Sequence, residues 1–250
     1  MSPPAPGSHI HLIAVCGVGM ASLAGLLKSR GYHVTGSDQN IYPPMSTYLA
    51  EIGIMIQSGY HAEHVGPRPD LVIIGNAISR GNPEAEAVLS QGIPYISFPQ
   101  ALGEFLIASN SSLVVTGTHG KTTTAALVAW VLTRAGLDPG FFVGGVPLNF
   151  GSGWSPGSGE HVVIEGDEYD SAFFDKGPKF LHYRPRNVIL TSVEFDHADI
   201  YRDLEHLKSA FQRLMEIIPA EGRLLVCSDY GAALEVAALA HCPLLTYGDD

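Results

Sequence analysis

The sequence predicts an α/β protein built on parallel β-sheets with helices on both faces. Short runs rich in Val, Ile and Leu alternate along the chain with helix-forming stretches, the pattern of strand–helix–strand units. Hydrophobic residues make up 46% of the 250 residues and charged residues only 16%, as expected for strands buried on both faces. Two glycine-rich turns, each between a predicted strand and helix, indicate two such units in series.

Composition narrows the class of protein. The formal net charge is -11 and no basic run occurs, so a nucleic-acid partner is not expected. The three cysteines lie far apart without a paired motif, which favours reduced thiols in a cytoplasmic protein. No apolar run approaches the roughly 20 residues that span a bilayer. Residues 1–8 have neither a basic start nor an apolar core, and we expect a flexible tail there.

The first unit is predicted from its alternating elements. We expect, in order, a strand at His9–Cys16, a helix ending near Arg30, strands at His33–Gly36 and Asp70–Gly75, a helix from Asn82 to Leu89, a strand at Pro94–Ser97 and a helix at Leu102–Ile107. Asn76 and Ser79 follow a strand's carboxyl end, where open α/β sheets bind ligands, and are candidate substrate contacts. His61 and His64 flank Glu63, but a polar loop is favoured there over a metal site.

The first glycine turn is a candidate diphosphate site. It comprises Gly17, Val18, Gly19 and Met20, and the next strand delivers Ser37 and Asp38. In dinucleotide-binding turns the glycine backbone approaches a diphosphate, and an acidic residue about 20 positions on contacts a ribose. Ser22 stands where the third glycine of that pattern would be. Another diphosphate ligand, such as a UDP-sugar, is therefore favoured over a nicotinamide cofactor, and a tight turn without a ligand stays open.

The second glycine turn is a phosphate loop. The strand Val114–Thr116 leads into Gly117, Thr118, His119, Gly120, Lys121, Thr122 and Thr123, and Ala125–Arg134 is a predicted helix. Glycines let backbone N–H groups converge on phosphate, Lys121 can reach the outer phosphates, and the Thr122 hydroxyl can bind Mg²⁺. The loop is shorter than the usual one, because Val115 stands where its first glycine would be. The polar Ser109–Ser112 linker before it places the domains at 9–108 and 109–250.

Carboxylates follow two later strands. The strand His161–Ile164 ends in Glu165-Gly166-Asp167-Glu168-Tyr169-Asp170, and the strand Asn187–Val193 ends in Glu194-Phe195-Asp196-His197. So many close carboxylates repel one another unless a cation or solvent separates them. We expect Glu165 and His197 to reach the sheet edge that carries the phosphate loop, as metal-assisted phosphoryl transfer requires. A solvated acidic loop is the alternative. Further strands are predicted at Arg223–Cys227 and Leu244–Tyr247, with a helix at Tyr230–Ala240 between them.

Together these motifs resemble the Mur ligase family, the ATP-dependent amide-forming enzymes of bacterial cell-wall synthesis. The resemblance spans nearly the whole chain and rests on the two glycine turns, on Glu165–Glu168 and on Glu194–His197. Three phrases resemble the branch that joins UDP-N-acetylmuramate to L-alanyl-γ-D-glutamyl-meso-diaminopimelate in cell-wall recycling. They are YPPMST at 42–47, DEYDSAFFDK at 167–176 and FDHAD at 195–199. The branch that attaches L-alanine is the alternative.

The resemblance implies roles for named residues. The turn at Gly17 would hold the UDP diphosphate, and the loop at 117–123 would hold ATP. Thr122 and Glu165 would ligate one Mg²⁺, with Glu165 and His197 serving a second. Lys121, Glu165 and His197 are the implied catalytic residues. The amine donor would be a peptide or an amino acid.

The chain departs from the family pattern in a few places. Gly166 replaces a usual alanine, and Ser192 replaces a common asparagine, which puts that contact in question. Gln212 stands where some relatives carry a carbamoylated lysine. The C-terminal amine-binding domain of the family is not expected within these 250 residues. A non-catalytic UDP-sugar or nucleotide-binding module therefore stays open, as does a dehydrogenase, although a dehydrogenase leaves the Gly-Lys-Thr loop unexplained. The sequence indicates no oligomeric state.

Overall fold

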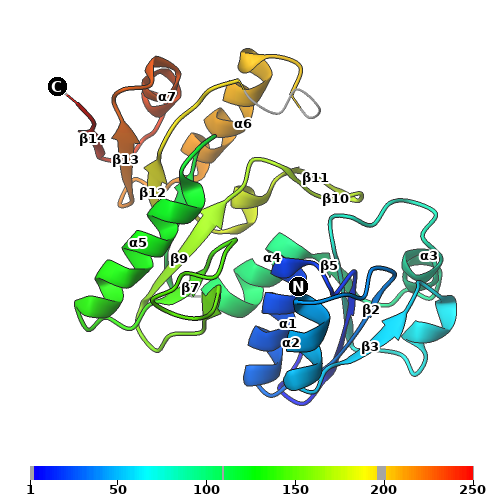
Figure 1. The fold of residues 1–250 in the computed structure, drawn as a ribbon. Coiled ribbons are helices and arrows are strands. Elements are labelled where there is room, and N and C mark those ends of the chain that lie inside the picture. Colours follow the sequence, from blue (N-terminus) through cyan, green and yellow to red (C-terminus); the bar gives the residue numbers. More distant parts are fainter. Residues whose placement is uncertain (1–2, 109, 196–200, 250) are drawn as a thin grey trace. The chain divides into compact units, whose positions relative to one another are not determined.

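The protein is described by a computed structural model, which covers residues 3–108, 110–195 and 201–249 (Figure 1). The chain forms two compact units. The first contains the residues up to Phe105 together with Asp170–Lys176, and the second contains Leu106–Tyr169 and the residues from Gly177 on. Each unit is built on its own largely parallel sheet, so the predicted α/β class is confirmed.

The first unit is a five-stranded parallel sheet in the order β3-β2-β1-β4-β5. Its elements are β1 (His9–Ile13), α1 (Val18–Ser29), β2 (His33–Asp38), α2 (Met45–Glu51), β3 (Met55–Ser58), the 3-10 helix η1 (Ala62–Val65), β4 (Leu71–Ile74), α3 (Pro83–Ser90), β5 (Tyr95–Ser97), α4 (Phe98–Leu102) and the π-helical η2 (Gly103–Ile107). Helices α1 and α2 lie side by side in Figure 1, and α3 packs beside η1. The strand order reverses direction between β1 and β4, which creates a switch point there.

The first two strands have different limits from those predicted. β1 ends at Ile13 because Ala14 has a φ of 70°, outside the strand region. The N–H groups of Ala14 and Val15 instead both donate to the carbonyl oxygen of Ser37. β2 extends through Asp38, which pairs with Ser58 of β3 and so belongs to the strand and not to the loop after it.

The residues before β1 are tied to the rest of the first unit. The Tyr32 hydroxyl donates to the Pro4 carbonyl at 2.9 Å, and Gly7 N–H donates to the Gly31 carbonyl at 2.9 Å. His33 N–H donates to the Ser8 carbonyl at 3.0 Å. These contacts connect the segment that was expected to be a flexible tail to the turn between α1 and β2.

The second unit is a seven-stranded, mostly parallel sheet in the order β14-β13-β12-β6-β9-β7-β8, with β8 antiparallel to β7. Its elements are β6 (Ser111–Thr116), α5 (Lys121–Arg134), β7 (Gly140–Phe142), β8 (Trp154–Ser155), β9 (His161–Gly166), the 3-10 helix η3 (Lys179–His182), β12 (Asn187–Leu190), α6 (Leu204–Ile217), β13 (Arg223–Cys227), α7 (Gly231–Ala237) and β14 (Leu244–Tyr247). β6 lies between β9 and β12, with Thr116 opposite Gly166 on one side and Leu190 on the other. The carboxyl ends of these three strands are therefore level.

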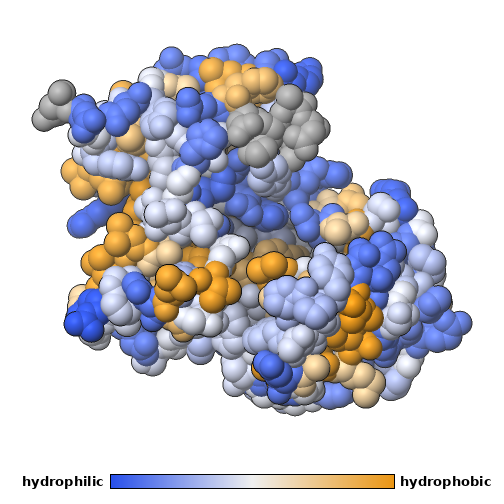
Figure 2. Space-filling view, in the orientation of Figure 1, coloured by the Kyte–Doolittle hydropathy of each residue, from blue (hydrophilic) through white to orange (hydrophobic). Residues whose placement is uncertain are grey.

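Helix α5 packs on the sheet through small residues. Ala125 and Ala129 are fully buried, whereas Leu127 and Val131 are more than half exposed. Small contact residues let the helix approach the sheet closely. Val128 and Leu132 pack beside them against the core, whereas Leu127 and Val131 point outward. Figure 2 shows hydrophobic side chains among polar ones in this part of the surface. Among the described residues, none of the helices combines the length and hydrophobicity needed to cross a membrane.

A hairpin from the second half of the sequence packs with the first unit. It consists of β10 (Asp170–Ala172) and β11 (Asp175–Pro178). The Ser97 hydroxyl donates to the Asp175 carboxylate at 2.7 Å, and the Phe174 ring meets Tyr95 edge-on at 4.9 Å. The chain therefore passes between the units after Phe105, after Tyr169 and after Lys176.

Candidate functional site

The phosphate loop runs from the end of β6 to the start of α5, as predicted. Gly117 has a φ of 132°, and a Cβ there would lie 2.7 Å from both the backbone N and O of Ser192. Gly120 has a φ of 79° and precedes the first residue of α5. Glycine is thus required at 117 by backbone shape and by contact with the chain after β12, and at 120 by backbone shape alone.

Two amides of the loop are already bonded within the protein. Thr118 N–H donates to the Ser192 carbonyl at 3.0 Å, and His119 N–H donates to the Ser192 hydroxyl at 2.9 Å. The position that departs from the family pattern therefore supports the loop through both its backbone and its side chain. The donors that remain for a phosphate are the first-turn amides of α5, which begins at Lys121 and includes Thr122 and Thr123.

Side chains of this loop extend the network. The Thr118 hydroxyl is buried and lies 3.1 Å from the Glu194 carbonyl and 3.0 Å from the Glu194 N–H. The His119 ring is half exposed, 3.7 Å from the Glu194 carboxylate. The chain after β12 thus holds the loop from one side. The sequence predicted Thr118 and His119 as nucleotide contacts only, and not as residues that bind this part of the chain.

Thr122 and Glu165 meet directly. The Thr122 hydroxyl donates to Glu165 Oε2 at 3.1 Å, and Gly144 N–H donates to Glu165 Oε1 at 2.8 Å. The strand register produces this contact, because Glu165 lies opposite Val115, two residues before the loop begins. A hydroxyl and a carboxylate converging at a phosphate loop are oxygen ligands of the kind that Mg²⁺ prefers. The donor set therefore fits the predicted metal.

The environment of Glu165 also favours a cation. Burial raises the pKa of Glu165, and the nearby Asp167 carboxylate adds to this, while the hydrogen bonds from Gly144 and Thr122 oppose it. A buried carboxylate with a raised pKa gains most from a positive charge close by. Gly144, in the loop after β7, was not predicted to be part of the site, and the glycine pair at 144–145 was the signal available.

The acidic segment after β9 is separated into individual pairs. Glu168 pairs with Lys121 at 3.1 Å, Asp167 with Lys179 at 2.9 Å, and Asp170 with Lys176 at 2.8 Å. The sequence predicted that a cation or solvent would keep these carboxylates apart. In the structure, the ammonium groups of three lysines do so. Glu168 is 1% exposed, and sequence reasoning named it in a motif without giving it a role.

The predicted ligand His197 lies outside the described residues, as do Asp196 and Asp199. Within residues 3–108, 110–195 and 201–249, no group of three or more His, Cys, Asp or Glu side chains is arranged to hold a metal. His64 Nδ1 lies 3.3 Å from the Glu84 carboxylate, and its ring meets His61 edge-on. Glu84 also contacts His11 Nε2 at 2.6 Å, in a fully buried pair.

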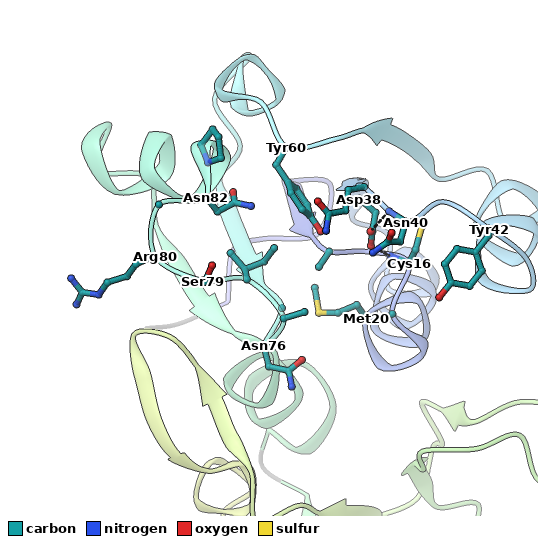
Figure 3. A pocket seen from close by; sticks show the side chains of 18 residues that line it. Cys16, Met20, Asp38, Asn40, Tyr42, Tyr60, Asn76, Ser79, Arg80 and Asn82 are labelled. Carbon is teal, nitrogen blue, oxygen red and sulfur yellow. Dashed lines mark hydrogen bonds between the residues drawn. The ribbon is translucent and has the colours of Figure 1, made fainter. Parts of the chain in front are cut away.

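The first unit has a cavity of about 500 Å³ at the carboxyl ends of β1, β2 and β4, at the switch point of the sheet. Figure 3 shows Cys16, Asp38, Asn40 and Tyr60 on one side, Asn76, Ser79 and Asn82 on the other, and Met20 between them. This volume is typical of small-molecule sites, and its lining mixes polar and apolar side chains as such sites do.

The cavity is lined by five of the eight predicted substrate contacts: Gly17, Met20, Asp38, Asn76 and Ser79. Ser37 instead points into the core, where its hydroxyl donates to the buried Glu84 carboxylate at 2.9 Å. Val18 and Gly19 are not among the lining residues. A Cβ on Gly19 would lie 3.0 Å from the Phe98 ring, so packing also explains this glycine.

Asp38 supports the cavity wall through backbone contacts. Its Oδ2 accepts from Cys16 N–H and its Oδ1 from Asn40 N–H, each at 2.8 Å. Burial and the Asp38 charge raise the pKa of Cys16 to about 11 and that of Tyr60 to about 12, so both side chains stay neutral. Tyr60 and Asn40 were not predicted, because they come from loops without a recognisable motif.

The fold and site together define an α/β protein with a switch-point cavity followed by a phosphate-loop unit. The chain belongs to the Mur ligase family. Residues 9–110 match the model "Mur ligase family, catalytic domain", and residues 115–250 match "Mur ligase middle domain".

The chain is similar to several individual proteins. UDP-N-acetylmuramate--L-alanyl-gamma-D-glutamyl-meso-2,6-diaminoheptandioate ligase from Escherichia coli (strain K12) is 52% identical over 87% of this chain and 48% of its own length. UDP-N-acetylmuramate--L-alanine ligase from Rubrobacter xylanophilus is 36% identical over 96% of this chain and 51% of its own. The crystal structure of UDP-N-acetylmuramate:L-alanyl-gamma-D-glutamyl-meso-diaminopimelate ligase from Neisseria meningitides superposes with a TM-score of 0.90 at 43% identity, covering 96% of this chain and 77% of that one. The chain spans about half the length of the curated relatives it matches.

Proposed function

We propose that the protein containing this chain is an ATP-dependent amide ligase that joins UDP-N-acetylmuramate to L-Ala-γ-D-Glu-meso-diaminopimelate in peptidoglycan recycling. A carboxylate oxygen of the sugar's lactyl group attacks the γ-phosphorus of ATP, ADP leaves, and an acyl phosphate forms. The tripeptide amine then attacks the acyl carbon to give a tetrahedral intermediate, inorganic phosphate leaves with the electrons of the C–O bond, and the nitrogen releases a proton to solvent. The observation that carries the proposal is the convergence of Lys121, Thr122 and Glu165 at one phosphate loop.

The nucleotide half of the proposal rests on the loop. In this proposal residues Gly117 to Thr123 form the ATP site and the first-turn amides of α5 face the phosphates. Lys121 would reach the phosphates by exchanging one of the protein groups that its ammonium contacts. Thr122, Glu165 and His197 are the metal ligands in this proposal, and Mg²⁺ supplies charge neutralisation for the phosphoryl group. Lys121, Glu165 and His197 are the catalytic residues. Their contribution is positioning and charge stabilisation, because phosphoryl transfer needs little covalent work from side chains.

The acceptor half rests on the switch-point cavity. We assign it to the UDP part of the sugar nucleotide, with the diphosphate at the N-terminus of α1, where Gly17 and Met20 line the cavity. Val18 and Gly19 would contribute only through the backbone of this turn. Asp38, Asn76 and Ser79 would contact the ligand from the other strand ends. Ser37 supports the site from the core through its bond to Glu84. The domains of this proposal are 9–108 for the sugar nucleotide and 109–250 for ATP, in a cytoplasmic protein without a nucleic-acid partner.

The choice of amine donor rests on the relatives. The tripeptide is favoured because proteins named for that donor are 52% and 47% identical to the chain, whereas those named for L-alanine are 32% to 38% identical. Overall sequence identity does not identify a residue that contacts the amine, so L-alanine remains the alternative donor.

A competition assay tests the proposal. The full-length protein is given UDP-N-acetylmuramate, Mg-ATP and equal concentrations of L-alanine and the tripeptide, and the product is identified by mass. A tripeptide adduct is the expected result, and an alanine adduct would replace the recycling reaction by the biosynthetic one. Absence of ADP release with both donors would refute the ligase and favour a binding module, while NADH binding seen by fluorescence would favour a dehydrogenase.

The assay has a matched variant. Lys121→Ala should lower turnover by about 10² to 10³, the loss expected when one preorganised charge is removed. Turnover within threefold of wild type would exclude the role given to Lys121.

A further inference from the structure

The ammonium group of the loop lysine is fully occupied by the protein itself. Lys121 Nζ donates to the Gly117 carbonyl at 2.7 Å, to the Thr118 carbonyl at 3.3 Å, and to the Glu168 carboxylate at 3.1 and 3.4 Å. A lysine ammonium has three N–H donors. Two loop carbonyls and one carboxylate therefore account for all of them, and a phosphate must displace at least one of these partners.

Glu168 is held firmly in this position. Its side chain is 1% exposed, and that of Lys121 is 13% exposed. The backbone carbonyl of Glu168 accepts a hydrogen bond from the Tyr201 hydroxyl at 2.5 Å, and Tyr201 is itself buried. Because neither carboxylate nor ammonium is well solvated, their attraction is only weakly screened. The attraction between the two charges is thus less screened by solvent than that of a surface ion pair such as Lys176–Asp170.

Glu165, near the end of β9, and Glu168, in the segment after it, differ in what they face. Glu165 contacts the Thr122 hydroxyl, whereas both oxygens of Glu168 face Nζ of Lys121. Glu168 therefore points at Lys121 and not at Thr122 and Glu165, the two residues proposed to bind the metal. A negative charge in contact with the ammonium also cancels much of the positive field that would attract a phosphate.

We propose that Glu168 is a positioning residue that holds Lys121 folded onto its own loop until nucleotide phosphates displace it, so that this carboxylate opposes nucleotide binding. The inference rests on the proposed ATP site. Binding exchanges the Glu168–Lys121 contact for a phosphate–Lys121 contact, and the affinity for nucleotide reports the difference between the two.

The test measures ADP binding to the 250-residue chain by titration calorimetry, with Mg²⁺ and with EDTA. Glu168→Gln keeps the size of the side chain and an acceptor oxygen but removes the charge, and should bind ADP at least about tenfold more tightly in both conditions. Glu168→Asp keeps the charge but withdraws it by one methylene group, and should give a smaller gain. A metal ligand would behave differently, because its loss would weaken binding with Mg²⁺ only.

Asp167→Asn is the matched control. It removes the same charge from the neighbouring residue, whose partner is Lys179, and should change ADP affinity by less than about threefold. In a Lys121→Met background the gain from Glu168→Gln should also fall below about threefold, because the released ammonium is the source of the gain. Urea unfolding of each variant shows that it is folded.

The outcomes separate this inference from the proposed function. Tighter binding by Glu168→Gln that depends on Lys121 supports it, and a purely structural role for Glu168 does not predict that result. Equal or weaker ADP binding by folded Glu168→Gln and Glu168→Asp variants, beside a wild-type chain that binds, overturns the inference and leaves the nucleotide site intact. Failure of the wild-type chain to bind ADP removes the nucleotide site itself, and the inference with it.

Discussion

Two glycines of the phosphate loop should respond very differently to the same substitution. Gly117→Ala combines a φ of 132° with a Cβ 2.7 Å from two backbone atoms of Ser192, and backbone atoms cannot move aside cheaply. Backbone strain costs about 1–3 kcal/mol and overpacking about 1–3 kcal/mol, so we expect a loss of roughly 2–6 kcal/mol in the free energy of unfolding. Gly120→Ala has a φ of 79° but its nearest neighbour is 4.0 Å away, so only the left-handed backbone cost of about 1–2 kcal/mol applies.

Tryptophan fluorescence during urea unfolding is the appropriate assay. The two tryptophans of the chain, Trp130 and Trp154, both belong to the second unit, so the signal reports the unit that carries the loop. With a urea dependence of about 2 kcal/mol per molar, the midpoint should fall by roughly 1–3 M for Gly117→Ala and by at most about 1 M for Gly120→Ala. Equal midpoints for the two variants would refute the reasoning, because only Gly117 approaches the chain after β12.

Three further changes test the site and its support. Thr122→Val should weaken ADP binding about tenfold with Mg²⁺ but not with EDTA, whereas Thr122→Ser should bind ADP like wild type. Titration calorimetry measures the affinities, and equal losses in both conditions would exclude the metal role of Thr122. Burial raises the pKa of Glu165, so its ionisation costs stability above that raised pKa and costs nothing below the ordinary value of 4.5. Glu165→Gln should therefore raise the urea midpoint of the second unit near pH 7.5 and leave it unchanged near pH 4. A gain that is independent of pH would contradict this cause. Glu84→Ala removes the partner of the buried His11 and should destabilise the first unit by about 3–5 kcal/mol. Glu86→Ala, at an exposed position of the same helix, should cost less than about 1 kcal/mol. Hydrogen exchange of the backbone amides in β1 and β2 measures the difference.

The sequence predicted the elements whose signals are local and regular. β6, the loop glycines and α5 form one continuous strand–turn–helix motif, and β9, β12 and β13 are short apolar runs that read clearly as buried strands. Helix α6 was not predicted, although its buried residues include Leu207, Phe211 and Leu214 at helical spacing. The hairpin β10–β11 could not be assigned to the first unit, because its packing partners Tyr95 and Ser97 lie far away in the sequence.

The limits of sequence reasoning are clearest among the candidate site residues. Ser37 and Asp38 are neighbours, yet alternation along β2 turns Ser37 toward Glu84 and leaves Asp38 at the cavity. The sequence named both as substrate contacts, because the ligand-binding pattern fixes a distance along the chain and not a face of the strand. Gly19 was interpreted as part of a ligand-binding turn, with a tight turn without a ligand as the alternative. Neither interpretation included the Phe98 ring, which occupies the space beside Gly19.

By itself, the sequence determined the α/β class, the resemblance to the Mur ligase family and the loop that presents Lys121 and Thr122. Each of these depends on residues that lie close together in the chain. Only the tertiary structure decided which carboxylate meets which of these side chains. Glu165 is 43 residues from Thr122, and Glu168 is 47 residues from Lys121. The register of β6 with β9 sets the Glu165 pairing, and a shift of one residue would turn every β9 side chain to the opposite face. The Glu168 pairing depends in addition on the path of the segment after β9.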